Sequence, residues 1–173
     1  MEMNFCRRCG TPLTHTERHI YTCANSHMLF ANATPGVGVF LITEDNKVVL
    51  AIRGVEPEKG MLDTAGGFVD GEEPLEDALA RELSEELGLD KSEYTSPRFL
   101  CSAIGHTLYE GETIPILSSF FWARLKVNRT LIPSDDVAGI RTLHINDIDF
   151  DELHDSDIRV GVTQLQKLDI FAR

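Results

Sequence analysis

The chain has 173 residues, a length that suits one domain with a hydrophobic core and a small appendage. It carries 16 basic and 28 acidic residues, and a surface with a net charge of −12 repels a phosphate backbone, so we do not expect nucleic acid as a partner. No apolar run approaches the roughly 18 residues of a membrane span, and the first residues form no apolar signal segment, so we expect a cytoplasmic protein without a membrane partner.

Residues 1–33 differ in composition from the rest of the chain. They are polar and rich in Cys, His, Arg and Thr, and they contain too little apolar material to form a core alone. Cys6 and Cys9 flank two residues and precede a glycine, a spacing that lets two thiolates hold one tetrahedral ion. We therefore predict a small zinc ribbon with a structural Zn²⁺. A degenerate ribbon without metal is the alternative.

The spacing specifies the other two ligands of this ribbon less clearly. Cys23 is the third cysteine, and Ser26 stands three residues later, where a full ribbon has another cysteine. His27 follows directly. We predict that Cys23 and His27 complete a Cys3His site, with His15 and His19 as weaker alternatives for the fourth ligand.

Two β-rich runs follow the ribbon. Residues 36–43 and 47–54 are separated by a short polar turn and predict a hairpin, and residues 56–67 read as a loop rich in proline and glycine. Residues 74–88 predict a helix, because a proline stands near the start, acids occupy the first turn and a glycine stands at the C′ position.

The second half of the chain continues this mixture of strands and helices. Residues 96–127 predict two strands around a turn at 109–112, and residues 138–145 predict another strand. Cys101 lies in the first of these strands, where we expect a buried, unreactive thiol. Apolar spacing in 155–173 predicts a closing amphipathic helix. These elements indicate an α+β fold or a mixed three-layer arrangement.

The helix predicted at 74–88 carries a cluster of acidic residues. At about 100° per residue its leucines form one apolar stripe, and Glu82, Glu85 and Glu86 converge on a patch that borders this stripe. A solvated helix face explains such a patch. The alternative is a site for a divalent cation, to which the backbone of Gly66 and Gly67 in the preceding loop adds oxygen ligands.

The order of residues over 67–89 resembles the signature of the Nudix hydrolases. Gly67, Glu73 and the run 81–89 match its fixed positions over 23 residues, whereas Gly71 departs from the position that many members use. A looser resemblance covers residues 35–173. It implies an α+β fold of the Nudix type, an α/β/α sandwich with a mixed sheet. The domains would be a zinc ribbon at 1–33 and a Nudix hydrolase domain at 34–173.

The resemblance also implies an activity, the metal-dependent cleavage of the pyrophosphate bond in a nucleoside diphosphate linked to another group. Mg²⁺ or Mn²⁺ would be held by Glu82, Glu85, Glu86 and the carbonyl of Gly66, and Glu82 is also a candidate base. Arg81 would orient these carboxylates through charge-assisted hydrogen bonds.

Further residues have roles implied by the same resemblance. Glu73 would lock the loop to the helix. Many members supply another carboxylate from a later loop, although a solvated turn explains each candidate equally well. The candidates are Glu110, Glu112, Asp135 and Asp136. The candidate substrate contacts are Arg53, Phe68 and Glu112. Arg53 ends a strand and could reach a phosphate, although an exposed strand-end charge without a role explains it equally well, and Phe68 could stack on a base.

A ribbon followed by this domain resembles the NADH pyrophosphatase and ADP-ribose pyrophosphatase branch of the family. The NADH enzymes carry Ser-Gln-Pro-Trp-Pro-Phe-Pro soon after the acidic helix, and this chain lacks it, so we expect an ADP-ribose-like substrate rather than NADH. The alternative is a non-catalytic nucleotide sensor whose ribbon contacts a partner or nucleic acid, but sensors usually lose the carboxylates present here. The expected partner is a small nucleotide, and a homodimer is left open.

Overall fold

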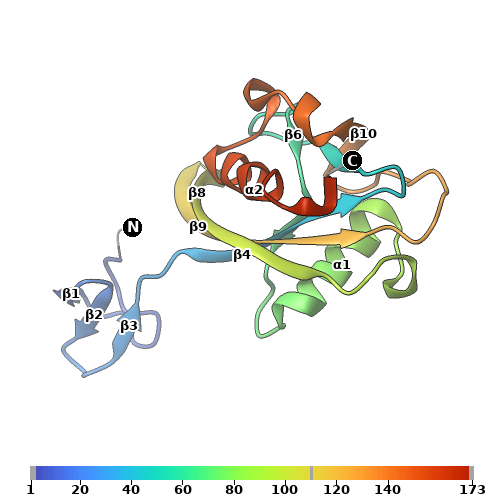
Figure 1. Ribbon diagram of the computed structural model, residues 1–173. Helices are drawn as coiled ribbons and strands as arrows, with labels where there is room; N and C mark the ends of the chain where they lie inside the picture. The colour runs from blue at the N-terminus through green and yellow to red at the C-terminus, as the bar shows by residue number, and fades with distance from the viewer. Residues whose placement is uncertain (1–2, 110, 172–173) are drawn as a thin grey trace. The chain divides into compact units, whose positions relative to one another are not determined.

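The computed structural model describes residues 3–109 and 111–171. Contacts within the chain divide it into two compact units, Met1–Thr34 and Pro35–Arg173. The smaller unit holds three short strands, and the larger unit holds the main sheet and both α-helices (Figure 1). Within the residues that the structure describes, no helix is both long enough and apolar enough to span a bilayer.

The smaller unit is a three-stranded antiparallel sheet. Its strands are β1 (Leu13–Glu17), β2 (Ile20–Cys23) and β3 (Met28–Phe30), in the order β1-β2-β3. Its buried side chains are Cys6, Cys23 and Leu29, with Met3 and Leu13 packed against them. So small a core rarely stabilises a fold alone, which is why units below about 40 residues usually depend on a metal or a disulfide.

The larger unit is built on a seven-stranded sheet. The strands are β4 (Thr34–Ile42), β5 (Lys47–Arg53), β6 (Leu62–Asp63), β7 (Ala65–Phe68), β8 (Arg98–Tyr109), β9 (Glu112–Arg124) and β10 (Val137–His144). Five of them run in the order β10-β5-β4-β9-β8, while β6 pairs with β5 and β7 pairs with β4. The expected hairpin over 36–54 and the strand pair around 109–112 are therefore confirmed.

The sheet is mixed, as expected. Most neighbouring strands are antiparallel. In contrast, Gly36 lies against Ile116 and the N–H of Leu125 donates to the carbonyl of Ile42 (2.9 Å), so residue numbers rise together along β4 and β9. These two central strands are parallel.

Helices cover both faces of the sheet (Figure 1). Because side chains alternate along a strand, β4 directs Val37, Val39 and Leu41 to one face, and Phe40 and Ile42 to the other. The first face packs against α1 (Leu75–Leu87) and the second against α2 (Ser156–Leu165). The described chain also has 3₁₀ turns at Lys91–Glu93, Ile145–Asp147, Phe150–Glu152 and Asp169–Phe171. The α/β/α sandwich is confirmed.

Helix α1 begins and ends where the sequence predicts. Pro74 is the N-cap in an extended conformation, and Gly88 ends the helix in the left-handed region at φ 62°. The N–H of Gly88 donates to the carbonyl of Ser84 (3.1 Å), and the N–H of Leu89 donates to the carbonyl of Leu83 (3.0 Å). This is the Schellman pattern, which glycine permits without strain.

Two expectations about local structure were wrong. Residues 56–67 are not only loop, because their second half forms β6 and β7 through pairing with β5 and β4, which short glycine-rich segments do not reveal by propensity. The closing helix is shorter than 155–173. It ends at Leu165 and is followed by the single turn Asp169–Phe171, within the described residues.

Tight packing of α2 on the sheet generates a first prediction. A Cβ on Gly161 would lie 2.9 Å from the ring of Phe40, which is fully buried. We expect Gly161→Ala to destabilise the protein by about 1–3 kcal/mol through overpacking. Val160→Ala, at an exposed position of the same helix, is the control and should change stability by less than about 0.5 kcal/mol. Chemical denaturation measures both, and equal effects would contradict this packing.

Candidate active site

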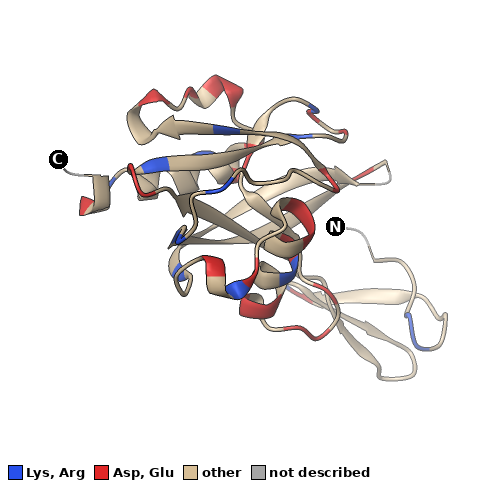
Figure 2. Cartoon of the chain, turned by 90° about the vertical axis from the view of Figure 1, so that its right-hand side faces the viewer, with Lys and Arg blue, Asp and Glu red and all other residues tan. Residues whose placement is uncertain are grey.

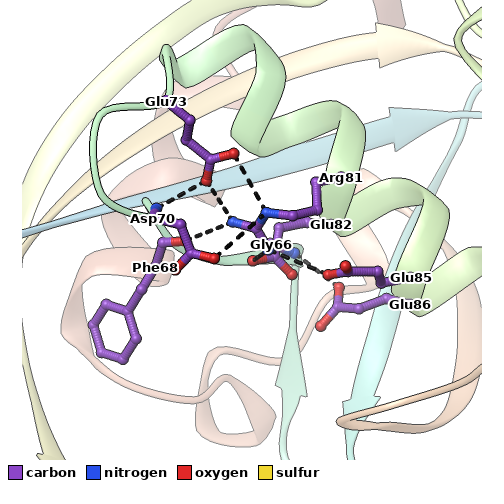
Figure 3. Close-up of polar contacts among 8 residues, drawn as sticks. All are labelled: Gly66, Phe68, Asp70, Glu73, Arg81, Glu82, Glu85 and Glu86. Carbon is purple, nitrogen blue, oxygen red and sulfur yellow. Dashed lines mark hydrogen bonds and ion pairs between the residues drawn. The ribbon is translucent and has the colours of Figure 1, made fainter.

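The backbone of β7 lies against the acidic side of α1 (Figure 3). The N–H of Gly66 donates to Glu86 Oε2 (2.9 Å), and a Cβ on Gly67 would lie 2.4 Å from Glu82 Oε1. Gly66 also adopts φ 152°, where a Cβ would lie 2.1 Å from the carbonyl oxygen of Val37. Only glycines at these two positions allow β7 to lie between β4 and the two carboxylates.

Arg81 is the centre of the polar network at this contact (Figure 3). Its Nη1 donates to Glu82 Oε1 (2.7 Å) and Glu85 Oε2 (3.2 Å), and its Nη2 donates to Glu73 Oε1 (2.6 Å) and the carbonyl of Phe68 (3.0 Å). The hydrogen bond to Glu73 is the main cause that raises the pKa of the guanidinium. One arginine therefore fixes two of the three clustered carboxylates.

Glu73 fixes the loop that connects β7 to α1. Its Oε1 accepts from the N–H of Asp70 (2.8 Å) as well as from Arg81. The hydrogen bond from Arg81 is the main cause that lowers the pKa of Glu73. Glu73 thus joins the loop to the helix by contacts on both sides.

The three clustered carboxylates differ in exposure. The residues Glu82 and Glu86 are only 8% and 6% exposed, whereas the Glu85 side chain is 49% exposed. Burial raises the pKa of Glu82, and it raises the pKa of Glu86 to about 8. Of the three, only Glu85 therefore lies on a solvated helix face. Burial of Glu82 and Glu86 has a desolvation cost, and a purely structural role in α1 would not require that cost.

The donor set suits a hard divalent cation, because it consists of carboxylate oxygens beside a backbone loop. In this structure the three carboxylates do not converge on one point. Arg81 holds Glu82 and Glu85, the N–H of Gly66 holds Glu86, and the described residues include no trio of acidic oxygens within 4.8 Å of one another.

A cleft of about 590 Å³ contains this network. Asp135 and Asp136 line it from the loop before β10, and the N–H of Ser134 donates to the carbonyl of Glu86 (2.9 Å), which ties that loop to α1. Glu112 is exposed at the start of β9 and is not among the lining residues. Glu110 lies outside the described residues.

The other candidate substrate contacts, Arg53 and Phe68, line the cleft. Arg53 is already engaged, because its Nη1 donates to Asp63 Oδ2 (3.0 Å) and its Nε to the carbonyl of Pro57 (3.1 Å). Phe68 meets the ring of Tyr109 edge to face, with centroids 5.7 Å apart. Asp63 was not singled out from the sequence, although an acid beside the Gly66–Gly67 pair was a usable signal. Burial raises its pKa.

A further part of the cleft lining comes from the start of α2 and was also missed. Asp155 and Asp157 line the cleft, together with His154. His154 Nδ1 lies 2.6 Å from Glu58 Oε2. In the sequence these residues read only as the start of a helix, and nothing local indicated that they meet the acidic end of α1 in one cleft.

The smaller unit gathers the four predicted zinc ligands. One donor atom from each of Cys6, Cys9, Cys23 and His27 lies within 4.8 Å of the other three. Cys6 Sγ is 3.5 Å from His27 Nδ1, and Cys9 Sγ is 3.8 Å from Cys23 Sγ. Zn–S bonds of about 2.3 Å in a tetrahedron give S···S edges of about 3.8 Å, so the spacing fits zinc.

The thiol of Cys9 favours its ionised form, whereas burial raises the pKa of the Cys6 thiol. The hydroxyl of Thr11 lies 3.1 Å from Cys9 Sγ, and this side-chain hydrogen bond is the main cause that lowers the pKa of Cys9 to about 5. Thiolates rather than thiols are metal ligands. The weaker alternatives His15 and His19 do not belong to the cluster.

The raised pKa of Glu86 generates a second prediction. Its ordinary value is 4.5 and its folded value is about 8, so the folded state binds more protons between these values and stability falls as pH rises through them. Without added Mg²⁺ or Mn²⁺, we expect Glu86→Gln to melt about 3 °C or more above the wild type at pH 8 and at the same temperature at pH 4.5.

The exposed Glu85 provides the control for this experiment. Glu85→Gln should show no pH-dependent gain, because its side chain remains in contact with solvent. Thermal unfolding followed by circular dichroism measures all three proteins. A pH-independent difference between Glu86→Gln and the wild type would contradict the assignment.

Comparison with known proteins places this geometry in a family. The chain matches the model of the NUDIX domain over residues 32–162. It is 24% identical over 149 residues to the NAD-capped RNA hydrolase NudC of Pseudomonas putida (strain W619), which covers 85% of this chain and 50% of that protein. It is 45% identical over 49 residues to the ADP-ribose pyrophosphatase of Methanocaldococcus jannaschii, which covers 28% of this chain and 29% of that protein.

The chain therefore spans half the length of the first of these curated relatives and less of the second. Among solved structures, a NUDIX hydrolase from Nitrosomonas europaea has a TM-score of 0.67 at 21% identity, covering 99% of this chain and 92% of that chain. This similarity shows a shared fold. Since the family model matches well over half of the sequence, including β7 and α1, the chain belongs to the NUDIX family.

Proposed function

We propose that this chain hydrolyses the pyrophosphate bond of a nucleoside diphosphate linked to a second group, with Mg²⁺ or Mn²⁺ as cofactor. The observation that carries this proposal is the burial of Glu82 and Glu86 against the Gly66–Gly67 backbone, with Arg81 holding the network. Burying two carboxylates within one cleft costs free energy, and a bound cation offsets this cost. The likeness to proteins named as hydrolases and pyrophosphatases supports it.

In the proposed mechanism, Glu82, Glu85, Glu86 and the carbonyl of Gly66 would hold the cation. When bound, the cation neutralises charge on the pyrophosphate oxygens and lowers the pKa of a bound water. Arg81 restricts the side chains of Glu82 and Glu85. Glu82 is also the proposed base, because it is a carboxylate within the acidic cluster, beside the place where the water would be bound.

An ADP-ribose-like molecule is the proposed substrate. Phe68 and Tyr109 line the cleft as an aromatic pair, which suits stacking against a base. Relatives named as an ADP-ribose pyrophosphatase and as NAD-capped RNA hydrolases point to ligands in which adenosine diphosphate is joined to another group. The Ser-Gln-Pro-Trp-Pro-Phe-Pro segment is absent from this sequence, so ADP-ribose ranks above NADH.

A non-catalytic nucleotide sensor is the alternative. It needs a cleft and an aromatic pair but not a cluster of buried carboxylates. Because Glu82, Glu85 and Glu86 are all present and two of them are buried, the geometry favours the hydrolase.

We also propose that Cys6, Cys9, Cys23 and His27 hold one structural Zn²⁺. Four protein ligands leave no open position for chemistry, and the apolar core of this unit is small. The ion would supply the stability that the core lacks.

Removal of the metal ligands is the third prediction. With ADP-ribose as substrate, Glu82→Gln and Glu86→Gln should each lower kcat by about 10²–10⁴-fold, and omission of divalent cations should abolish turnover. Glu76→Gln, at an exposed position in the first turn of α1, is the control and should retain activity. Measuring kcat/KM for ADP-ribose, NADH, diadenosine polyphosphates and nucleoside triphosphates under one metal condition tests the substrate.

Turnover without divalent cations, or a Glu86→Gln enzyme within threefold of the wild type, would overturn the mechanism. A value for NADH tenfold above that for ADP-ribose would overturn only the substrate assignment.

The zinc site generates the fourth prediction. Elemental analysis should find about one zinc per chain, and Cys6→Ser should lose the metal and unfold residues 1–34. Cys101→Ser is the control. This thiol is half-buried in β8, whereas we expected it to be fully buried, and burial raises its pKa. Its replacement should leave the zinc content unchanged. Protein purified without chelator that contains no zinc would show that the ribbon is degenerate.

A further inference from the structure

Two carboxylates at the start of α2 are fixed in the cleft by contacts with β8 and β9. The N–H of His106 donates to Asp155 Oδ2 (3.0 Å), and the hydroxyl of Ser118 donates to Asp157 Oδ2. A Cβ on Gly105 would lie 2.8 Å from Asp157 Cγ and 3.1 Å from Asp155 Oδ2, so a side chain at this position would displace the carboxylates. We call Asp155 and Asp157 the α2 carboxylate pair.

The cleft offers little positive charge to balance this pair. Ten carboxylate residues line it, against the two arginines Arg53 and Arg81. Arg53 is engaged with Asp63 and a backbone carbonyl, and Arg81 is engaged with the carboxylates of α1. Acidic residues also outnumber basic residues along the chain, 28 against 16 (Figure 2). Among the described residues, no lining arginine or lysine is left without a carboxylate partner.

The proposed cations account for only part of this charge. They would be held by α1 and the carbonyl of Gly66, where they would neutralise charge on the pyrophosphate of the substrate. The α2 carboxylate pair comes from another element, where Asp155 is the N-cap of α2, and its hydrogen bonds come from neutral donors, namely backbone N–H groups and serine hydroxyls. An anionic group beside this pair would meet like charge in a partly desolvated cleft, whereas a sugar hydroxyl would find an acceptor.

We propose that the α2 carboxylate pair sets the charge selectivity of the site. The group joined to the nucleoside diphosphate faces this pair and is uncharged or cationic, such as a hydroxyl-rich sugar, while the base lies at the Phe68–Tyr109 pair. A substrate with an additional phosphate monoester or carboxylate on that distal group is rejected by repulsion, which is specificity by exclusion. This inference rests on the proposed function and names the class of substrate for the same cleft.

The fifth prediction compares ligands that differ by one anionic group. ADP-ribose and ADP-ribose 1″-phosphate differ only on the distal ribose, and UDP-glucose and UDP-glucuronate differ only in a carboxylate. We expect the more anionic member of each pair to have a kcat/KM at least tenfold lower with Mg²⁺, and a dissociation constant raised by a similar factor with Ca²⁺ as the only divalent cation. Added salt should reduce both ratios.

Variants then assign the effect to the pair. Asp157→Asn keeps an oxygen that accepts from Ser118, and Asp155→Asn changes the other member independently. Each should lower the discrimination about threefold or more by improving the phosphorylated ligand, without improving ADP-ribose. Asp149→Asn is the matched control, since Asp149 caps a helical turn through the N–H of Asp151, as Asp155 caps α2 through the N–H of Ser156, but does not line the cleft. Thermal unfolding checks that each variant is folded.

The outcomes separate this inference from the proposed function. If no ligand is hydrolysed but the binding ratios hold, hydrolysis fails as the function and the charge selectivity stands. If hydrolysis occurs with equal kcat/KM and equal dissociation constants within each pair, the inference is wrong and the function stands. Three further outcomes would also overturn the inference. They are discrimination against ADP-ribose 2′-phosphate but not against the 1″-phosphate, unchanged discrimination in both Asn variants, and no binding of any ligand.

Discussion

The candidate site depends on the close approach of a glycine backbone to a buried carboxylate face. Side chains at Gly66 or Gly67 would collide with β4 or with Glu82, so the contact between β7 and α1 exists only because these positions lack a Cβ. That contact desolvates Glu82 and Glu86. Arg81 and the N–H of Gly66 offset part of the cost, and the raised pKa of Glu86 shows that they do not offset all of it.

The sandwich architecture makes such a costly arrangement tolerable. Helix α1 has like charges three and four residues apart, which weakens an isolated helix by a few tenths of a kcal/mol per pair. Three of its leucines, Leu79, Leu83 and Leu87, are almost fully buried in the core that includes β4, and burial of each contributes about 1.5–3 kcal/mol. Packing on the opposite face by α2 holds the sheet from the other side. The core therefore supports an acidic patch that helix propensity alone would not.

The two units contain candidate metal sites with different kinds of donor atoms. The smaller one groups sulfur and nitrogen donors at tetrahedral spacing, with all four positions supplied by the protein. The larger one presents oxygen donors along an open cleft whose arginines are already paired. Under the proposed function, the charge of the cleft has two effects. It attracts the cations that activate a pyrophosphate, and away from those cations it repels any further anion.

Much of the fold and part of the site followed from local sequence patterns, because the physical causes are local. Pro74 and Gly88 set the ends of α1, the leucine stripe placed Glu82 and Glu86 beside the core, and cysteine spacing indicated the ribbon. The pairing of β6 with β5 and of β7 with β4, the engagement of Arg53 by Asp63, and the α2 carboxylate pair did not follow. These features join residues far apart in the chain through strand order and helix packing. Sequence alone thus determined which residues can do chemistry, and the tertiary structure decided which of them share one cleft, because only packing brings α1, β8 and the start of α2 together.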